Sequence, residues 1–71
     1  MRWPWDPPVL RRVVVQLKDD PTTALRGVLW SRGPWLTLRS PELLKTGMQP
    51  ERLVGDAVIH SSNVSFLQVL P

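Results

Sequence analysis

Hydrophobic and polar positions alternate along much of this chain with the two-residue period of β-strands. In residues 9–18, Val13, Val15 and Leu17 fall on one face, while Val14 and Gln16 fall on the other. The further β-favouring runs are residues 23–31, 35–40, 56–60 and 64–70. The pattern therefore predicts an all-β chain of five short strands.

Turn-forming residues separate these predicted strands. The stretch Asp19-Asp20-Pro21-Thr22 is typical of a turn, because aspartate accepts hydrogen bonds from nearby amides and proline fixes φ. Arg32-Gly33 is a compact hairpin signal. Only Ser61, Ser62 and Asn63 separate the last two strands. That connection is too short for a relaxed hairpin, so we expect a tight helical bend that places the two strands on different edges.

A hairpin with Arg32 and Gly33 at its tip predicts the cross-strand partners. On one face they are Leu29 with Leu36 and Gly27 with Leu38, and on the other Trp30 with Trp35 and Arg26 with Arg39. Two facing arginines call for an anion between them, and tryptophan and arginine are enriched at contact hot spots. We therefore predict partner binding at Arg26, Trp30, Trp35 and Arg39. The alternative is that the tryptophans close the core of the chain itself.

Two segments fall outside the regular strand pattern. Residues 1–8 contain three prolines together with Trp3 and Trp5, which predicts an extended arm that docks on a surface or else a terminal tail. Residues 9–71 then form the domain. Ser40 followed by Pro41 is typical of a helix start, so residues 40–45 are expected to form one or two helical turns or a structured loop. Residues 46–54 read as a connection.

Composition narrows the functional classes. With 71 residues the chain makes one small domain, whose stability is marginal without disulfides, metals or assembly. It has no cysteine and one histidine, so we expect no disulfide, metal or cofactor. Association with other chains is then the expected source of additional stability. The net charge of +3 fits a mixed surface. Without a long apolar stretch or signal peptide, we expect a soluble intracellular product and no membrane partner.

Catalysis is not expected. His60 lies beside Ser61 and Ser62, but neighbouring side chains on a strand point apart, whereas a nucleophile and its base must meet within about 3 Å. The sequence also holds no glycine-rich phosphate loop and no cluster of metal ligands. We therefore assign no catalytic residue and predict that the protein is not an enzyme.

Three motifs resemble those of Sm-like proteins. Val13-Val14-Val15-Gln16-Leu17 is similar to the family's V-x-V-x-L, Arg26-Gly27-Val28-Leu29 to its x-G-x-L, and Ile59-His60-Ser61-Ser62-Asn63-Val64 to its I-R-G-x-N-V. The resemblance implies a small, strongly bent, five-stranded SH3-like barrel, in which Gly27 marks a sharp bend of a strand. It also implies free strand edges that pair with neighbouring subunits to build rings.

The same resemblance guides the functional prediction. The family's RNA pockets use an Asp-x-aromatic-x-Asn loop and an Arg-Gly pair, whereas this chain has Ser31-Arg32-Gly33-Pro34-Trp35 and His60-Ser61, so the base-reading residues are absent. The segments 35–39 and 55–71 look like small Sm-like proteins encoded among the structural genes of tailed actinobacterial phages. This implies a minor capsid or head-connector component in the virion, with capsid proteins, connector proteins or copies of itself as partners.

One alternative remains open. In a ring-forming binder of RNA or single-stranded nucleic acid, Trp30 and Trp35 would stack on bases while Arg26 and Arg39 would hold phosphates. Such a protein would act in the cytoplasm, whereas the virion component would be assembled there. We favour protein partners over nucleic acid.

Overall fold

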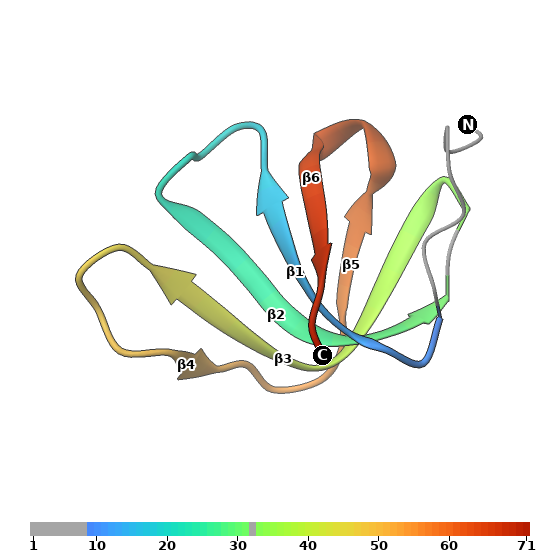
Figure 1. The fold of residues 1–71 in the computed structure, drawn as a ribbon, viewed down its shortest axis with the longest axis horizontal. Coiled ribbons are helices and arrows are strands. Elements are labelled where there is room, and N and C mark those ends of the chain that lie inside the picture. The colour runs from blue at the N-terminus through green and yellow to red at the C-terminus, as the bar shows by residue number, and fades with distance from the viewer. Residues whose placement is uncertain (1–8, 32) are drawn as a thin grey trace.

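The computed structural model describes residues 9–31 and 33–71 as one strongly bent antiparallel β-sheet (Figure 1). The expected arm, residues 1–8 with Trp3 and Trp5, lies outside the described residues. Strands are joined in the order β4-β3-β2-β1-β6, and β5 pairs with β3. The elements are β1 (Arg12–Leu17), β2 (Thr23–Ser31), β3 (Trp35–Lys45), β4 (Glu51–Arg52), β5 (Ala57–His60), the 3₁₀ turn η1 (Ser61–Asn63) and β6 (Val64–Val69). The all-β prediction is confirmed for this part of the chain.

The buried face of the sheet follows the predicted alternation. Val13 and Val15 of β1 are fully buried, and Leu17 packs against the same cluster. Branched side chains on alternate positions pack closely on the concave side of a bent sheet. The core consists of Val13, Val15, Leu25, Leu29, Leu36, Leu38, Ile59 and Val64. Alternate residues of these strands, such as Val14, Arg26 and Thr37, are partly exposed on the outward face.

Strands β2 and β3 bend together, and this bend shapes the sheet (Figure 1). Between the pairs Arg26↔Glu42 and Val28↔Arg39, β3 uses one more residue than β2, which makes a β-bulge. Ser40 in the bulge has φ of 51°, and the Pro41 side chain is fully buried. Past the bend, β3 pairs with β4, while its first half pairs with β5.

Two sequence predictions about the middle of the chain were wrong. The segment from Ser40 to Lys45 forms the second half of β3, because Leu43 pairs with Leu25 and packs against the core. The expected connection contains the two-residue strand β4, so the described chain has six strands where five were predicted.

Two of the three predicted turns lie entirely within the described residues, and both are present. Asp20 accepts hydrogen bonds from the Thr22 backbone N–H and from the hydroxyls of Thr22 and Thr23. The last connection is the tight helical bend η1, capped by His60, whose side chain accepts a hydrogen bond from the Ser62 N–H. Strands β5 and β6 leave this bend toward different partners, β3 and β1, and the sheet is not closed.

Candidate interaction surface

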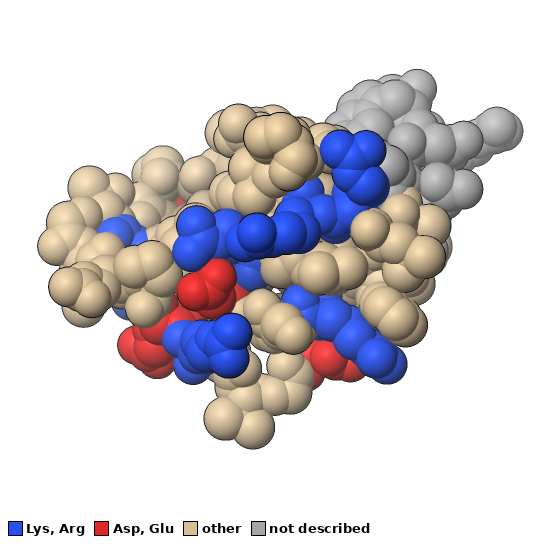
Figure 2. All heavy atoms as spheres, turned by 60° about the horizontal axis from the view of Figure 1, so that its bottom comes forward, with Lys and Arg blue, Asp and Glu red and all other residues tan. Residues whose placement is uncertain are grey.

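The outward face of the sheet carries the predicted site residues that the structure describes. Arg26 and Trp30 alternate with buried residues of β2, and Trp35 and Arg39 alternate with buried residues of β3. Trp30 is 47% exposed and Trp35 is 55% exposed. The structure therefore brings these side chains to one face, which Figure 2 shows with basic groups spread across it and acidic groups between them.

The predicted pairing of Arg26 with Arg39 is wrong. Arg26 lies opposite Glu42, and its Nη2 is 3.0 Å from Glu42 Oε1. The Arg26 Nε also donates to that oxygen at 3.0 Å. The anion that two facing arginines would need from a partner is therefore supplied by the chain itself, by the residue that directly follows the bulge.

Arg39 makes two contacts on the same face. Its guanidinium carbon lies 4.0 Å from the centre of the Trp30 ring. Its Nε lies 3.8 Å from Asp56 Oδ2, in a pair whose side chains are about half exposed. A cation stacked on an exposed tryptophan contributes roughly 0.5–1 kcal/mol. Trp30 and Asp56 thus hold the Arg39 side chain in place.

The tryptophans do not pair with each other. The predicted partner of Trp30 was Trp35, but Leu29 pairs with Leu38 and Ser31 with Thr37, so the register excludes that pair. Trp35 lies opposite His60 of β5, and their rings meet edge to face with centres 4.7 Å apart. Each tryptophan keeps about half of its surface open to solvent.

His60 and Ser62 lie closer together than expected from strand geometry. His60 Nδ1 is 2.7 Å from Ser62 Oγ and accepts from the Ser62 backbone N–H at 3.2 Å. The two side chains do not point apart as predicted, because the chain leaves the strand after His60 and enters η1. This contact caps the 3₁₀ turn, and no carboxylate among the described residues hydrogen-bonds to the imidazole.

Two arginines of this face were missed by sequence reasoning. Arg12 of β1 lies opposite Val28, which in turn lies opposite Arg39. Arg52 of β4 lies opposite Glu42. The alternation of Arg12 with Val13 could have indicated the first, whereas β4 had no signal of its own in the sequence. We call Arg12, Arg26, Arg39 and Arg52, which come from four adjacent strands, the arginine face.

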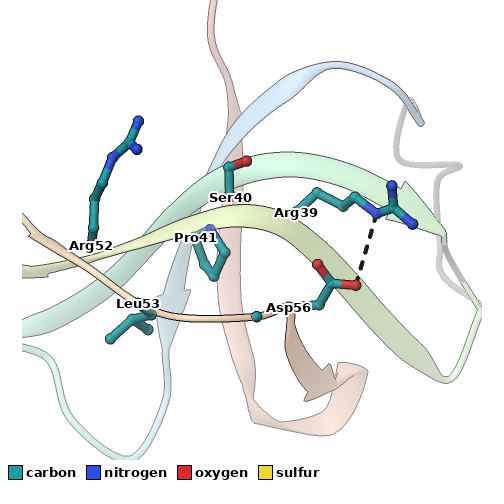
Figure 3. Close-up of a pocket in the computed structure, with 7 residues that line it drawn as sticks. Arg39, Ser40, Pro41, Arg52, Leu53 and Asp56 are labelled. Atoms are coloured by element: carbon teal, nitrogen blue, oxygen red, sulfur yellow. Dashed lines mark ion pairs between the residues drawn. The ribbon is translucent and has the colours of Figure 1, made fainter.

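A pocket opens beside the arginine face, between the bend of β3 and the segment that joins β4 to β5. Its volume is about 410 Å³. Figure 3 shows Arg39 and Arg52 on opposite sides of Pro41, with Asp56 turned toward Arg39. It is lined by Arg39, Ser40, Pro41, Arg52, Leu53, Gly55 and Asp56. The pocket therefore combines an apolar floor with a charged rim.

Three strands of the described sheet, β4, β5 and β6, each pair with only one neighbour and leave a free edge. In the described part of the chain, β5 pairs only with β3 and β6 only with β1. Neither strand contains lysine, arginine, aspartate, glutamate or proline. Val58 on β5 is 59% exposed and Phe66 on β6 is 56% exposed.

Comparisons with known proteins assign no family. No protein-family model matches the chain, and no curated protein matches it either. Within the described residues, no group of three or more histidine, cysteine or acidic side chains could hold a metal ion. The same part of the chain has no helix of the length and hydrophobicity needed to cross a membrane.

Proposed function

We propose that this protein is a non-enzymatic assembly subunit with an Sm-like fold, which joins other protein subunits through the free edges of β5 and β6. The observation that carries the proposal is the pair of uncharged, unpaired strand edges on a sheet that does not close. Edge strands expose backbone N–H and C=O groups, and natural proteins normally protect them with charges or proline. Because β5 and β6 lack such protection, we expect another polypeptide strand to pair with these edges in the assembled protein.

The side chains along these edges indicate that the binding partner is a protein. Phe66 and Val69 of β6 and Val58 of β5 are exposed large apolar groups. Strand addition would pair the backbone groups, while the apolar side chains would pack against the new neighbour. Since β5 and β6 are different edges of one subunit, contact between β5 of one copy and β6 of the next is heterologous. Repeated contacts of this kind close into a ring or grow into a filament.

The sequence resemblance supplies the location in this proposal. Small Sm-like proteins among the structural genes of tailed phages would act as minor capsid or head-connector components. The partners would then be capsid or connector proteins, or further copies of the chain.

The edge proposal is tested by sedimentation of the full chain over a range of concentrations. Phe66→Lys places a charge on the β6 edge, and Met48→Lys places the same charge on an exposed apolar residue away from both edges. We expect the wild type and Met48→Lys to associate and Phe66→Lys to remain monomeric with an unchanged circular dichroism spectrum. Association that is equal in all three chains would contradict the proposal, as would a wild type that stays monomeric.

Nucleic-acid binding is the second candidate, and the arginine face is the observation that favours it. Arg12 and Arg52 form no ion pair with any described residue and could contact phosphates. Phosphate contacts make affinity fall steeply as salt rises. A labelled single-stranded oligonucleotide titrated over a salt series therefore separates this function from a purely protein-binding one.

A further inference from the structure

The arginine face carries an excess of positive charge. Arg26 is paired with Glu42 at 3.0 Å and Arg39 with Asp56 at 3.8 Å. Four arginines against two carboxylates leave an excess of two positive charges. That excess belongs to Arg12 and Arg52, both exposed and without an ion pair among the described residues.

The unpaired arginines stand on opposite sides of the face. Arg12 is on β1 and Arg52 is on β4, so three strand spacings separate their strands. At about 4.8 Å per spacing this distance is roughly 14 Å, which an extended peptide spans with about five residues. Arg12 lies in the row of Val28 and Arg39, whereas Arg52 lies in the row of Arg26 and Glu42. An extended chain that crosses the face obliquely, with acidic residues about five positions apart, matches the separation of the two strands.

The pocket lies along the same path. The apolar surface of its floor comes mainly from the half-buried Leu53, because Pro41 beneath it is fully buried, and its rim includes Arg52 and the paired Arg39 (Figure 3). An apolar floor with a basic rim fits an apolar side chain whose neighbours are acidic. The exposed Trp30, held under Arg39 at 4.0 Å, extends the apolar area beyond the pocket.

We propose that the arginine face binds an acidic, extended segment of a partner protein, with carboxylates at Arg12 and Arg52 and an apolar side chain in the pocket. Such a segment satisfies both the surplus charge and the apolar floor. The chain's own residues 1–8 do not have this chemistry, because Asp6 is their only acidic residue and Arg2 offsets its charge.

A peptide fits this face better than a nucleic acid does. Glu42 lies directly between Arg26 and Arg52 in the strand register, so a phosphate backbone that follows this row would pass over a carboxylate. Like charges at such distances are repulsive. The backbone of a peptide is uncharged, so it can cross this row with its acidic side chains away from Glu42, and its N–H groups can donate to Asp56. One face of the Trp30 ring is already covered by Arg39, which leaves that face closed to base stacking.

This inference does not rest on the edge-pairing proposal, because different side chains form the two surfaces. The test uses the full chain and a labelled peptide of about ten residues, which is long enough to cross four strands with both ends free. The acidic peptide contains aspartate and glutamate around one central leucine. Its control contains asparagine and glutamine at the same positions, and an oligothymidylate of equal length represents nucleic acid.

Two double variants are compared: one reverses two charges on the arginine face, and the other reverses two charges away from it. Arg12→Glu with Arg52→Glu changes the exposed, unpaired arginines, whereas Lys18→Glu with Lys45→Glu makes the same change in net charge at exposed positions away from the face. We expect fluorescence anisotropy to show at least about tenfold weaker binding of the acidic peptide to the arginine variant. The lysine variant should stay within about twofold of wild type. Phe66→Lys should bind the peptide normally, which separates this result from failure of the edge proposal.

Several outcomes would overturn the inference. One is equal binding of the acidic peptide and its amide control, and another is equal weakening by the lysine and arginine variants. Tighter, strongly salt-dependent binding of the oligothymidylate would assign the face to nucleic acid. A loss of self-association on reversal of Arg12 and Arg52, measured by sedimentation without peptide, would assign it to a second copy of the chain.

Discussion

The backbone carbonyl oxygen of Arg39 lies so close to Gly27 that a Cβ on Gly27 would be only 2.8 Å away from it. The same Cβ would lie 3.3 Å from Leu38 Cβ and 3.4 Å from Pro41 Cα. Gly27 does not have a positive φ, so the requirement for glycine comes from space alone. The closeness of β2 and β3 at this point is what allows both strands to bend around the core.

Gly27→Ala is therefore expected to destabilise the fold. The atom in the way is backbone, so relief requires the two strands to move apart, and overpacking of this kind costs roughly 1–3 kcal/mol. Urea denaturation followed by tryptophan fluorescence measures the change in the free energy of unfolding. Ser31→Ala, on an exposed position of the same strand, is the control and should be nearly neutral. An alanine variant as stable as wild type would show that the strands separate at no cost.

The faces of the strands could be predicted from the sequence, but their partners could not. The prediction paired Leu29 with Leu36, whereas Leu29 pairs with Leu38. A shift of two residues keeps every side chain on its own face, so the buried and exposed sets survived this error. The predicted cross-strand partners of Arg26 and Arg39 were wrong, because the bulge at Ser40 and Pro41 shifts the register by one further residue. Bulges arise from packing between strands and have no period in the sequence.

The predicted helix start shows a second limit of local signals. Ser40 followed by Pro41 is a strong local cap, yet the segment extends β3 because its side chains complete the core. Tertiary packing overrides such propensities. The interaction surface was predictable to the same extent. Residues in clearly alternating strands were placed on the correct face, while Arg52 lay in a segment without such a pattern.

Substitutions of Ser40 should depend on backbone conformation. Its φ of 51° is in the left-handed region, which glycine and asparagine tolerate and β-branched residues do not. Ser40→Val is expected to cost about 1–2 kcal/mol of unfolding free energy, while Ser40→Gly should be neutral or stabilising. Because Ser40 is exposed, packing of its side chain contributes little to the comparison. Equal stability of the valine and glycine variants, measured by urea denaturation, would contradict this explanation.

Asp20 should make stability depend on pH in the acid range. Hydrogen bonds from the Thr22 and Thr23 side chains, with one from the Thr22 backbone, lower the pKa of Asp20 below its ordinary value. A carboxyl whose pKa is lower in the folded state stabilises the fold above its unfolded pKa of about 4. That contribution is lost as the pH falls through the lower, folded pKa.

Thermal unfolding across this range measures the effect. Asp20→Asn should lower the melting temperature at neutral pH and flatten its fall below about pH 4. Asp19→Asn is the control, since Asp19 accepts none of these hydrogen bonds. If both variants keep the acid dependence of the wild type, Asp20 does not contribute to it.

Glu42 should affect stability and binding in opposite directions. It pairs with Arg26 at 3.0 Å and lies opposite Arg52 in the strand register, so it is the acidic group at the centre of the arginine face. Both side chains of the ion pair are partly exposed, and pairs of this kind contribute roughly 0.2–1 kcal/mol. Glu42→Gln should lower the free energy of unfolding by an amount in this range, and added salt should reduce the loss.

The same substitution frees Arg26 and raises the positive excess of the face by one charge, so the acidic peptide should bind more tightly. A cycle with Arg26→Gln, measured by urea denaturation and peptide anisotropy, isolates the pair. Weaker peptide binding by Glu42→Gln would show that Glu42 itself contacts the peptide or holds Arg26 in its binding position, and that the arginines do not act through net charge.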